Sequence, residues 1–295
     1  MAGRSLILVL SVLLAACSPL GALNSILPKG DYELRQDLAY GPLPAQKLDI
    51  YVPVERKDGG NRAVLVFLHG GAWNTGSKNE YRFVGDQFAR RGIVTVIPDF
   101  RLYPQVQFPV FLQDAALVLR WVMDHLQELD ANPGQVYLAG HSSGAHMAMM
   151  LAFDQQWLAQ QGLDHRKLAG VIGLAGPYDF LPLTEPLVQK VFASANPLEL
   201  SQPVHFVEPG LPRVLLAVGL KDNRVKPRNS ASLAEKLRRA GDPVQLLTYP
   251  DTGHAGILLS LSRPLQNLTD VADRMAVFIL DRAAEPASRP SQPEK

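Results

Sequence analysis

The stretch Gly140-His141-Ser142-Ser143-Gly144 decides which fold is expected for this chain. It follows the apolar run 135–139 and precedes the Ala- and Met-rich run 145–152, an order that predicts a strand, a sharp turn and a helix. A Cβ atom at either flanking glycine would collide with the neighbouring strand or helix. The N–H of the residue after the serine is free because that residue opens a helix. The turn therefore offers a nucleophile and half of an anion site at one point.

The remainder of the chain alternates between apolar strands and amphipathic helices. Strand-like runs occur at 48–52, 63–68, 93–97, 168–174, 214–218 and 244–249. Helical periodicity is found at 81–91, 111–129, 230–240 and 271–281. This alternation predicts an α/β fold with a mostly parallel, doubly wound sheet that helices cover on both faces. The polar segment 55–62 is expected to form a hairpin turn.

Length and composition limit the domain organisation. The chain has 295 residues, of which 47% are hydrophobic, enough for one large α/β domain or two small ones. We expect one domain over 36–283. Within it, the segment 176–212 has seven prolines and little strand signal, which favours a short cap inserted between two strands. The Pro-containing tail 284–295 is expected to be disordered.

The N-terminus has the pattern of a secretory signal. One arginine at the start and an apolar run over 5–14, too short to span a bilayer as a mature helix, precede Leu14-Ala15-Ala16-Cys17. This ending resembles the bacterial lipobox, in which the cysteine is lipidated and becomes the first residue. We therefore expect a signal peptide over 1–16, a tether over 17–35 and attachment to a membrane by lipid. The alternative is an ordinary signal peptide with an incidental cysteine.

The residues around Cys17 also predict a location. Ser18 follows the cysteine, which resembles the outer-membrane sorting pattern of Gram-negative lipoproteins and predicts an envelope protein that faces the periplasm. Cys17 is the one cysteine of the chain, so no intrachain disulfide can form, and its lipidation suits an oxidising compartment. The net charge of +1, without a basic block, gives no sign of a nucleic-acid partner. The oligomeric state stays open.

A serine nucleophile needs a neighbouring base, and the base needs a carboxylate to orient it. In open α/β sheets such groups lie just beyond the carboxyl ends of the strands. Among seven histidines, His254 directly follows the last predicted strand, and Asp222 follows the strand before it. Two other carboxylates are less suited: Asp179 is expected to be a turn residue, and Asp251 lies too near its strand end. Ser142, Asp222 and His254 are therefore the predicted nucleophile, acid and base.

Two further histidines lie close to the serine in sequence. The side chain of His141 is expected to point away from the nucleophile, and His146 is expected to pack under the turn.

A glycine pair follows the strand 63–68, and its backbone N–H groups can face the turn without hindrance from side chains. With the N–H of Ser143 they would form an oxyanion hole. The alternative is a glycine turn without chemistry.

Three motifs together resemble one known family. His69-Gly70-Gly71-Ala72-Trp73 resembles the His-Gly-Gly-x-Trp oxyanion loop of carboxylesterases and kynurenine-formamidase-like enzymes. The run 99–104 (Asp-Phe-Arg-Leu-Tyr-Pro) and the elbow 140–146 resemble two further signatures of that group. Over 48–281, the chain is thus similar to α/β-hydrolases of the carboxylesterase and lipase type. The family's order Ser…Asp…His matches the order of the three residues named above.

The resemblance assigns roles residue by residue. It implies that Ser142 is the nucleophile, that His254 is first base and then acid, and that Asp222 orients it. It also implies that the backbone N–H groups of Gly71, Ala72 and Ser143 form the oxyanion hole. Ser143 replaces the family's usual alanine, and Ala72 replaces the third glycine, or the tyrosine of some relatives.

The function expected from these residues is hydrolysis of small-molecule carboxylic esters through an acyl-enzyme, without a metal or organic cofactor. Trp73 is expected to line the substrate pocket, although packing in the core or cap is an equally good interpretation. The alternative within enzymes is amide or formamide cleavage, as in arylformamidases, against which an envelope location argues. The alternative from another class is a non-catalytic envelope binding protein, whose signature would be a missing triad residue.

Overall fold

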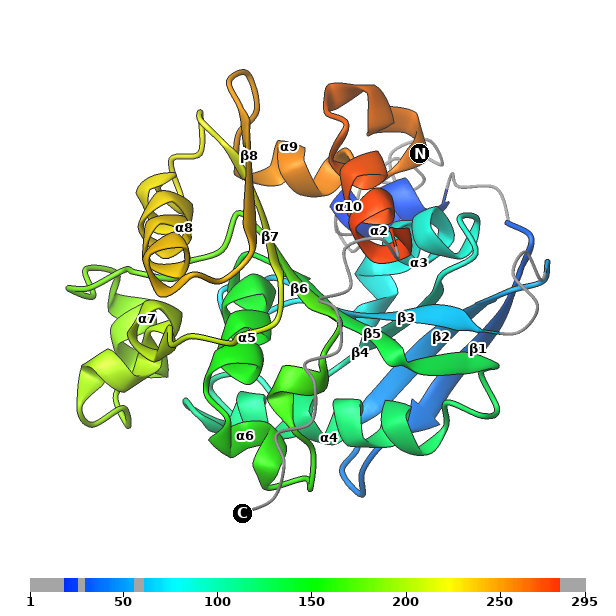
Figure 1. Ribbon diagram of the computed structural model, residues 1–295, viewed down its shortest axis with the longest axis horizontal. Coiled ribbons are helices and arrows are strands. Elements are labelled where there is room, and N and C mark those ends of the chain that lie inside the picture. The colour runs from blue at the N-terminus through cyan, green and yellow to red at the C-terminus, as the bar shows by residue number, and fades with distance from the viewer. Residues whose placement is uncertain (1–18, 26–29, 56–60, 282–295) are drawn as a thin grey trace, which may run out of the picture.

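The computed structural model describes residues 19–25, 30–55 and 61–281, and its centre is an eight-stranded sheet (Figure 1). The strands lie in the order β1-β2-β4-β3-β5-β6-β7-β8. All strands from β3 to β8 run parallel, and β2 is antiparallel to both of its neighbours. Their bounds are β1 Tyr32–Ala39, β2 Lys47–Pro53, β3 Arg62–Leu68, β4 Val94–Pro98, β5 Ala131–His141, β6 Gly170–Leu174, β7 Val214–Gly219 and β8 Val244–Tyr249. The predicted α/β class with a mostly parallel sheet is confirmed.

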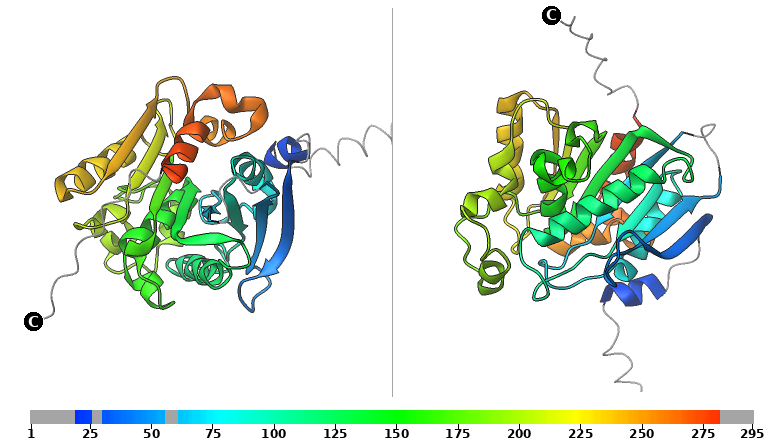
Figure 2. Two further views of the ribbon diagram at one scale, coloured as in Figure 1. Left: turned by 45° about the vertical axis from the view of Figure 1, so that its right-hand side comes forward. Right: turned by 90° about the horizontal axis from the view of Figure 1, so that it is seen from below.

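Helices cover both faces of the sheet (Figure 2). One face carries α4 Val110–Asp124, α5 Ser143–Phe153, α6 Gln156–Ala159, α7 Pro186–Val191 and α8 Arg228–Ala240. The other carries α2 Pro19–Ser25, α3 Arg82–Ala89, α9 His254–Leu259 and α10 Val271–Leu280. The apolar run of β3 explains this arrangement, because Val64 and Val66 pack on the first face while Leu65 and Phe67 pack on the second. A strand buried on both faces needs a continuous apolar sequence.

The tether expected over 17–35 is wrong where the structure describes it. Residues 19–25 form α2, and β1 begins at Tyr32 and pairs with β2. The amide of Asn24 holds α2 in place: its Nδ2 donates to the carbonyl of Asn79 at 2.9 Å, and its Oδ1 accepts the N–H of Phe83 at 3.1 Å. Contacts with distant parts of the chain thus stabilise a segment that has little periodicity of its own. The expected signal peptide, Cys17 and the tail 284–295 lie outside the described residues.

The hairpin expected at 55–62 is also wrong. A hairpin would place β2 beside β3, but β4 lies between these two strands. The segment therefore connects strands that are not neighbours, and its residues 56–60 lie outside the described part of the chain. The first residues of β5 include a local turn, in which the side chain of Asn132 accepts the N–H of Gly134 at 2.8 Å.

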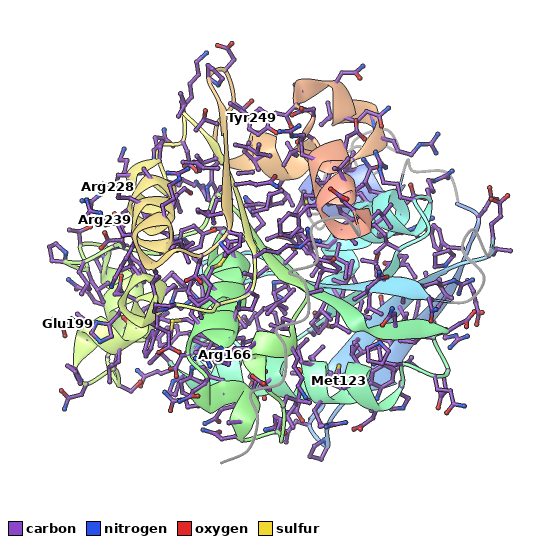
Figure 3. The ribbon with its side chains drawn as sticks, viewed as in Figure 1. Met123, Arg166, Glu199, Arg228, Arg239 and Tyr249 are labelled. Atoms are coloured by element: carbon purple, nitrogen blue, oxygen red, sulfur yellow. The ribbon has the colours of Figure 1, made fainter. Side chains whose placement is uncertain are left out.

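The segment 176–212 lies between β6 and β7 and contains α7 and two short 3-10 helices, η3 Leu198–Ser201 and η4 Pro203–Phe206. Figure 3 places Glu199 of this segment at the same outer edge of the molecule as Arg239 of α8. The segment packs against α5, because His146 Nε2 donates to the carbonyl of Ser201 at 2.8 Å. It therefore covers the helix that follows the elbow.

Candidate active site

The elbow has the geometry that its sequence predicts. Ser142 stands between β5 and α5 with φ 55° and ψ −122°, a backbone conformation that is rare for residues other than glycine. A Cβ atom on Gly144 would lie 2.1 Å from the carbonyl oxygen of Leu68, and one on Gly140 would lie 2.3 Å from the backbone of α5. Glycine is therefore required at both positions, and the serine side chain is displaced from the line of the strand.

The structure brings Ser142, His254 and Asp222 together from three connections at the carboxyl ends of the strands. Ser142 Oγ lies 3.0 Å from His254 Nε2, so the hydroxyl donates to that nitrogen. On the other side of the ring, Nδ1 lies 2.7 Å from Asp222 Oδ2 and donates to it. Asp222 follows β7, and His254 is the first residue of α9, a six-residue helix that the sequence did not predict. The arrangement can deprotonate the hydroxyl and stabilise the resulting imidazolium.

The environment of Asp222 keeps this carboxylate ionised. Burial would raise its pKa, but the hydrogen bond from His254 and the backbone N–H groups of Val225 and Arg224 outweigh burial and lower it below its usual value. Both N–H groups lie 2.9 Å from Oδ1. The two oxygens therefore have separate tasks, because Oδ1 binds the loop and Oδ2 binds His254.

Neither of the other two candidate carboxylates contacts His254. Asp179 Oδ2 accepts the hydroxyl of Ser232 at 2.5 Å. The exposed Asp251 forms an ion pair with Lys221 at 2.8 Å. Each aspartate thus has a side-chain partner outside the triad, which the sequence did not indicate, and neither orients His254.

His141 has a role that the sequence did not indicate. It does not simply point away from the site: its Nε2 donates to the backbone carbonyl of His254 at 3.1 Å, and the two rings lie 4.8 Å apart. Burial, followed by the nearby His254, lowers its pKa to about 3. His141 is therefore neutral, and its hydrogen bond holds the backbone carbonyl of His254, the predicted base, in place. The contact depends on the packing of α9 against the elbow, for which the sequence carries no local signal.

We expect the free energy of unfolding to fall as the pH is lowered from 7 to about 5.5. His69, His141 and His146 are buried, and burial lowers their pKa values to about 4, about 3 and about 4. In the unfolded chain a histidine titrates near pH 6.5, so below that pH the unfolded state binds more protons. Each histidine then lowers the free energy of unfolding by up to about 1.4 kcal/mol per pH unit. Urea denaturation at both pH values tests this, and equal free energies would contradict it.

The predicted oxyanion loop runs beside the elbow with an unusual backbone. Gly71, Ala72 and Trp73 have φ values of 130°, 50° and 59°. The carbonyl of Gly71 accepts the N–H groups of Asn74 and Thr75, both at 3.0 Å. Within the described residues, the N–H groups of Gly71 and Ala72 donate no hydrogen bond. These groups can therefore serve an external acceptor.

Trp73 is 4% exposed and packs between the elbow helix and the cap. Its ring is perpendicular to those of His146 and Phe192, at centroid distances of 5.1 and 4.9 Å, and stacks at 6.1 Å on Phe180. His146 is fully buried but packs against Trp73 and the cap rather than under the elbow, and no hydrogen bond joins it to Ser142 Oγ. The contact of Trp73 with substrate stays a prediction.

An open depression of about 500 Å³ lies between η4 and α8, away from the triad. Its lining includes Val204, Ser232 and Lys236. It contains none of the triad residues, and the hydroxyl of Ser232 is already bound to Asp179. We therefore place the chemistry at Ser142 and not in this depression.

A doubly wound sheet with a nucleophile elbow, and with a carboxylate and a histidine after the last two strands, defines the class of α/β-hydrolases with a Ser-His-Asp triad. The chain belongs to the BD-FAE family, whose model matches residues 48–237, well over half of the sequence. The predicted resemblance to α/β-hydrolases is thereby confirmed.

Individual proteins agree with this assignment. The chain is 27% identical over 254 residues to a probable isoprenylcysteine alpha-carbonyl methylesterase of Arabidopsis thaliana, with 77% of this chain and 52% of that protein covered. It thus spans about half the length of that relative. A kynurenine formamidase of Salmo salar is 26% identical over 81% of each chain. An inhibited esterase B from Lactobacillus rhamnosis has the same fold, with a TM-score of 0.76, 18% identity and coverage of 96% and 98%.

Proposed function

We propose that the protein hydrolyses small-molecule carboxylic esters through an acyl-enzyme formed on Ser142. The observation that carries the proposal is the continuous hydrogen-bond chain from Ser142 Oγ through His254 to Asp222, with steps of 3.0 and 2.7 Å. The similarity to a probable methylesterase supports the same chemistry. No residue of the triad is missing, which argues against a non-catalytic binding protein.

Acylation follows from this geometry. His254 Nε2 accepts the hydroxyl proton while Ser142 Oγ attacks the ester carbonyl carbon, and the carbonyl π electrons move onto oxygen. The imidazolium then gives its proton to the alcohol oxygen as the C–O bond breaks, so that the alcohol leaves and the acyl group stays on the serine. Asp222 accepts the Nδ1–H throughout and stabilises the positive ring.

Deacylation repeats these steps with water as the nucleophile, and it returns a carboxylic acid and the free serine. In both steps the negative oxygen needs donors that are in place beforehand. We assign this task to the backbone N–H groups of Gly71, Ala72 and Ser143. The last of these begins α5, where a free N–H and the helix dipole both favour negative charge.

The proposal is tested with p-nitrophenyl esters from acetate to laurate, using the chain that begins at Ser18. We expect hydrolysis well above that of the Ser142→Ala variant, with the highest kcat/KM for short acyl chains. The rings of Trp73, Phe180 and Phe192 pack against one another beside the elbow helix, and we expect them to limit the space for a long acyl chain. If the folded protein hydrolyses no ester faster than the variant, the proposal is wrong.

Formamide hydrolysis is a second candidate function, because a kynurenine formamidase matches four fifths of the chain. The same triad can attack a formyl group and protonate the leaving amine. Comparison of kcat/KM for N-formylkynurenine and p-nitrophenyl acetate separates the two functions. A higher value for the formamide would favour this second function.

We also propose that lipid on Cys17 anchors the protein in the bacterial envelope, at the outer membrane and facing the periplasm. Support comes from the sequence Leu14-Ala15-Ala16-Cys17 and the serine after it. No helix in the described ranges is long and apolar enough to cross a bilayer. Because α2 begins two residues after Cys17 and is docked through Asn24, the lipid would hold the domain close to the membrane.

In a Gram-negative host, we expect the full-length chain to incorporate an alkyne-labelled fatty acid and to sediment with the membranes. The Cys17→Ser variant should incorporate none, because the thiol that carries the lipid is absent. In-gel fluorescence after click labelling measures the incorporation. A wild-type chain that carries no label would contradict the anchor and leave the proposed hydrolase activity unaffected.

A further inference from the structure

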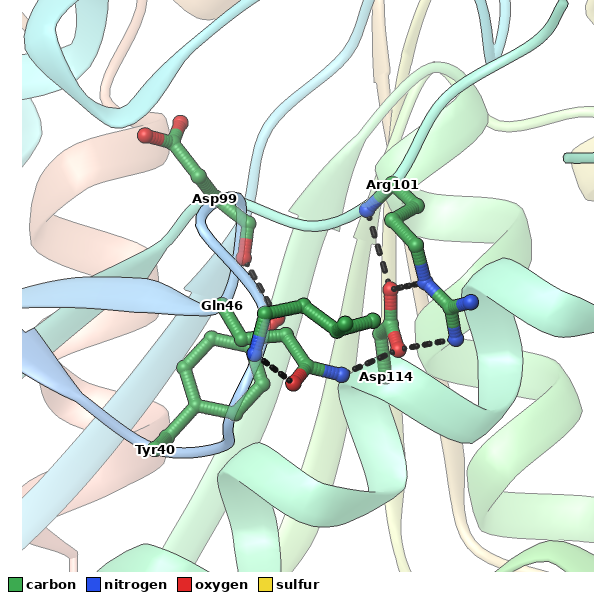
Figure 4. A network of polar contacts seen from close by, with 6 residues as sticks. Tyr40, Gln46, Asp99, Arg101 and Asp114 are labelled. Carbon is green, nitrogen blue, oxygen red and sulfur yellow. Dashed lines mark hydrogen bonds and ion pairs between the residues drawn. The ribbon is translucent and has the colours of Figure 1, made fainter. Parts of the chain in front are cut away.

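A buried ion pair fixes the loop between β4 and α4, outside the triad (Figure 4). Asp114 of α4 is fully buried and accepts four N–H groups. Three come from Arg101: its backbone N–H at 3.0 Å, Nε at 2.9 Å and Nη2 at 2.7 Å. The fourth comes from Gln46 Nε2 at 2.8 Å. Both oxygens of the carboxylate are thus bound.

The contacts of Asp114 neutralise its buried charge and also fix the position of the loop between β4 and α4. A guanidinium that binds both oxygens of a carboxylate has one orientation relative to it. Because the backbone N–H of Arg101 binds the same carboxylate, the loop is fixed to α4 at that residue. The start of the loop is held separately, since the hydroxyl of Tyr40 donates to the carbonyl of Asp99 at 2.7 Å (Figure 4).

Phe100, directly before Arg101, and Tyr103, two residues after it, contact the two ends of the oxyanion loop. Phe100 stacks on His69 with a centroid distance of 4.3 Å and an interplanar angle of 11°. The N–H of Tyr103 donates to the carbonyl of Trp73 at 2.8 Å. The loop from β4 therefore holds the oxyanion loop at its first and at its last residue.

The oxyanion loop needs such support because of its backbone. Ala72 and Trp73 both have positive φ without being glycine, and such conformations persist only where the surroundings impose them. If the carbonyl of Trp73 loses its partner, the peptide units on either side of it can rotate. The N–H groups of Gly71 and Ala72, which we assign to the oxyanion hole, would then move.

We propose that Arg101 and Asp114 are positioning residues for the oxyanion hole, acting through Phe100 and Tyr103 on the loop 69–73. The proposal rests on the proposed ester hydrolysis. The ion pair contacts none of the three triad residues, so it would affect the rate only by holding the oxyanion loop in place.

The test compares two buried carboxylates in matched settings. Asp114→Asn weakens the pair with Arg101. Asp86→Asn weakens the pair of Asp86, 2% exposed, with Arg90 at 3.0 Å within α3, on the opposite face of the sheet. Both changes remove a buried negative charge beside an arginine, so both should lower the melting temperature. Only the first changes an ion pair that is connected to the oxyanion loop, through Phe100 and Tyr103.

For p-nitrophenyl acetate, we expect Asp114→Asn to lower kcat by about 10- to 100-fold with little change in KM. A displaced N–H donor weakens the hydrogen bond to the oxyanion of the transition state more than the binding of the uncharged ester. The inhibition constant of an aryl trifluoromethyl ketone, which binds as an oxyanion, should rise by the same factor as kcat/KM falls. Asp86→Asn should leave both values near those of the wild type. If Asp114→Asn destabilises the protein but keeps kcat and the inhibition constant, the pair is structural only and the proposal is wrong.

A second variant keeps the test decisive if Asp114→Asn does not fold. Arg101→Lys retains the charge and the backbone N–H but loses the planar fork, and it should show the same parallel change in kcat/KM and inhibition constant, to a smaller extent. Unchanged values in folded Arg101→Lys would then overturn the proposal. A wild-type protein that does not hydrolyse the ester would contradict the proposed function itself, and with it this role of the pair.

Discussion

Replacing Ser142 by alanine is expected to lower kcat for p-nitrophenyl acetate by about 10⁴- to 10⁶-fold, the range found when a serine nucleophile is removed from a triad. The hydroxyl is the atom that forms the acyl bond, and no other described residue donates a hydroxyl to His254. The residual rate would come from substrate binding and the oxyanion hole. Steady-state kinetics with enzyme at high concentration measures the loss.

Ser143→Ala is the matched control for this prediction. Ser143 is adjacent and buried, and only its backbone N–H belongs to the proposed oxyanion hole. The control should therefore keep a rate close to that of the wild type. If kcat falls equally in both variants, the substitutions have damaged the elbow and the loss cannot be attributed to the nucleophile. A Ser142→Ala variant with the activity of the wild type would exclude an acyl-enzyme on Ser142.

The second large effect is expected for Asp222→Asn, with a loss in kcat of about 10⁴-fold. Oδ1 of Asp222 binds the N–H groups of Arg224 and Val225. In the variant the amide oxygen stays on these donors, so the amide NH₂ takes the place of Oδ2. It then donates to Nδ1 of His254, which moves the ring proton to Nε2. A ring protonated at Nε2 cannot accept the proton of the serine.

Asp251→Asn is the control for the acid. Asp251 is near His254 in sequence but is exposed and paired with Lys221. Its replacement should leave kcat unchanged, because an exposed ion pair of this kind contributes little even to stability. A large loss in Asp251→Asn together with an active Asp222→Asn would show that the acid of the triad is wrongly assigned.

Most of the fold could be predicted because the central parallel strands, such as β3, β4, β6 and β7, are buried on both faces and therefore have apolar sequences. The site could be predicted for a related reason. Ser142 and Asp222 follow the buried strands β5 and β7, His254 follows the half-buried edge strand β8, and the carboxyl ends of parallel strands lie at one edge of the sheet. The spacing of the glycines around Ser142 supplied the remaining signal, since their Cβ positions are occupied by neighbouring backbone.

The elements that escaped prediction depend on contacts between distant residues. The strand β1 is an edge strand of mixed exposure, and α2 has seven residues whose place is set by the amide of Asn24. The pairing of β2 with β4 is equally non-local, so a polar segment between β2 and β3 suggested a hairpin that does not exist. The contact of His141 with the base and the bond between Asp114 and Arg101 have no local pattern either.

The central claim is that Ser142 is the nucleophile of an acyl-transfer enzyme, and covalent labelling tests it most directly. The protein is incubated with a fluorophosphonate, and intact-mass and peptide mass spectrometry then locate the adduct. We predict one adduct per chain, on the peptide that contains Ser142, and much slower labelling of Asp222→Asn. No adduct on the folded protein, or an adduct at another residue, would contradict the account.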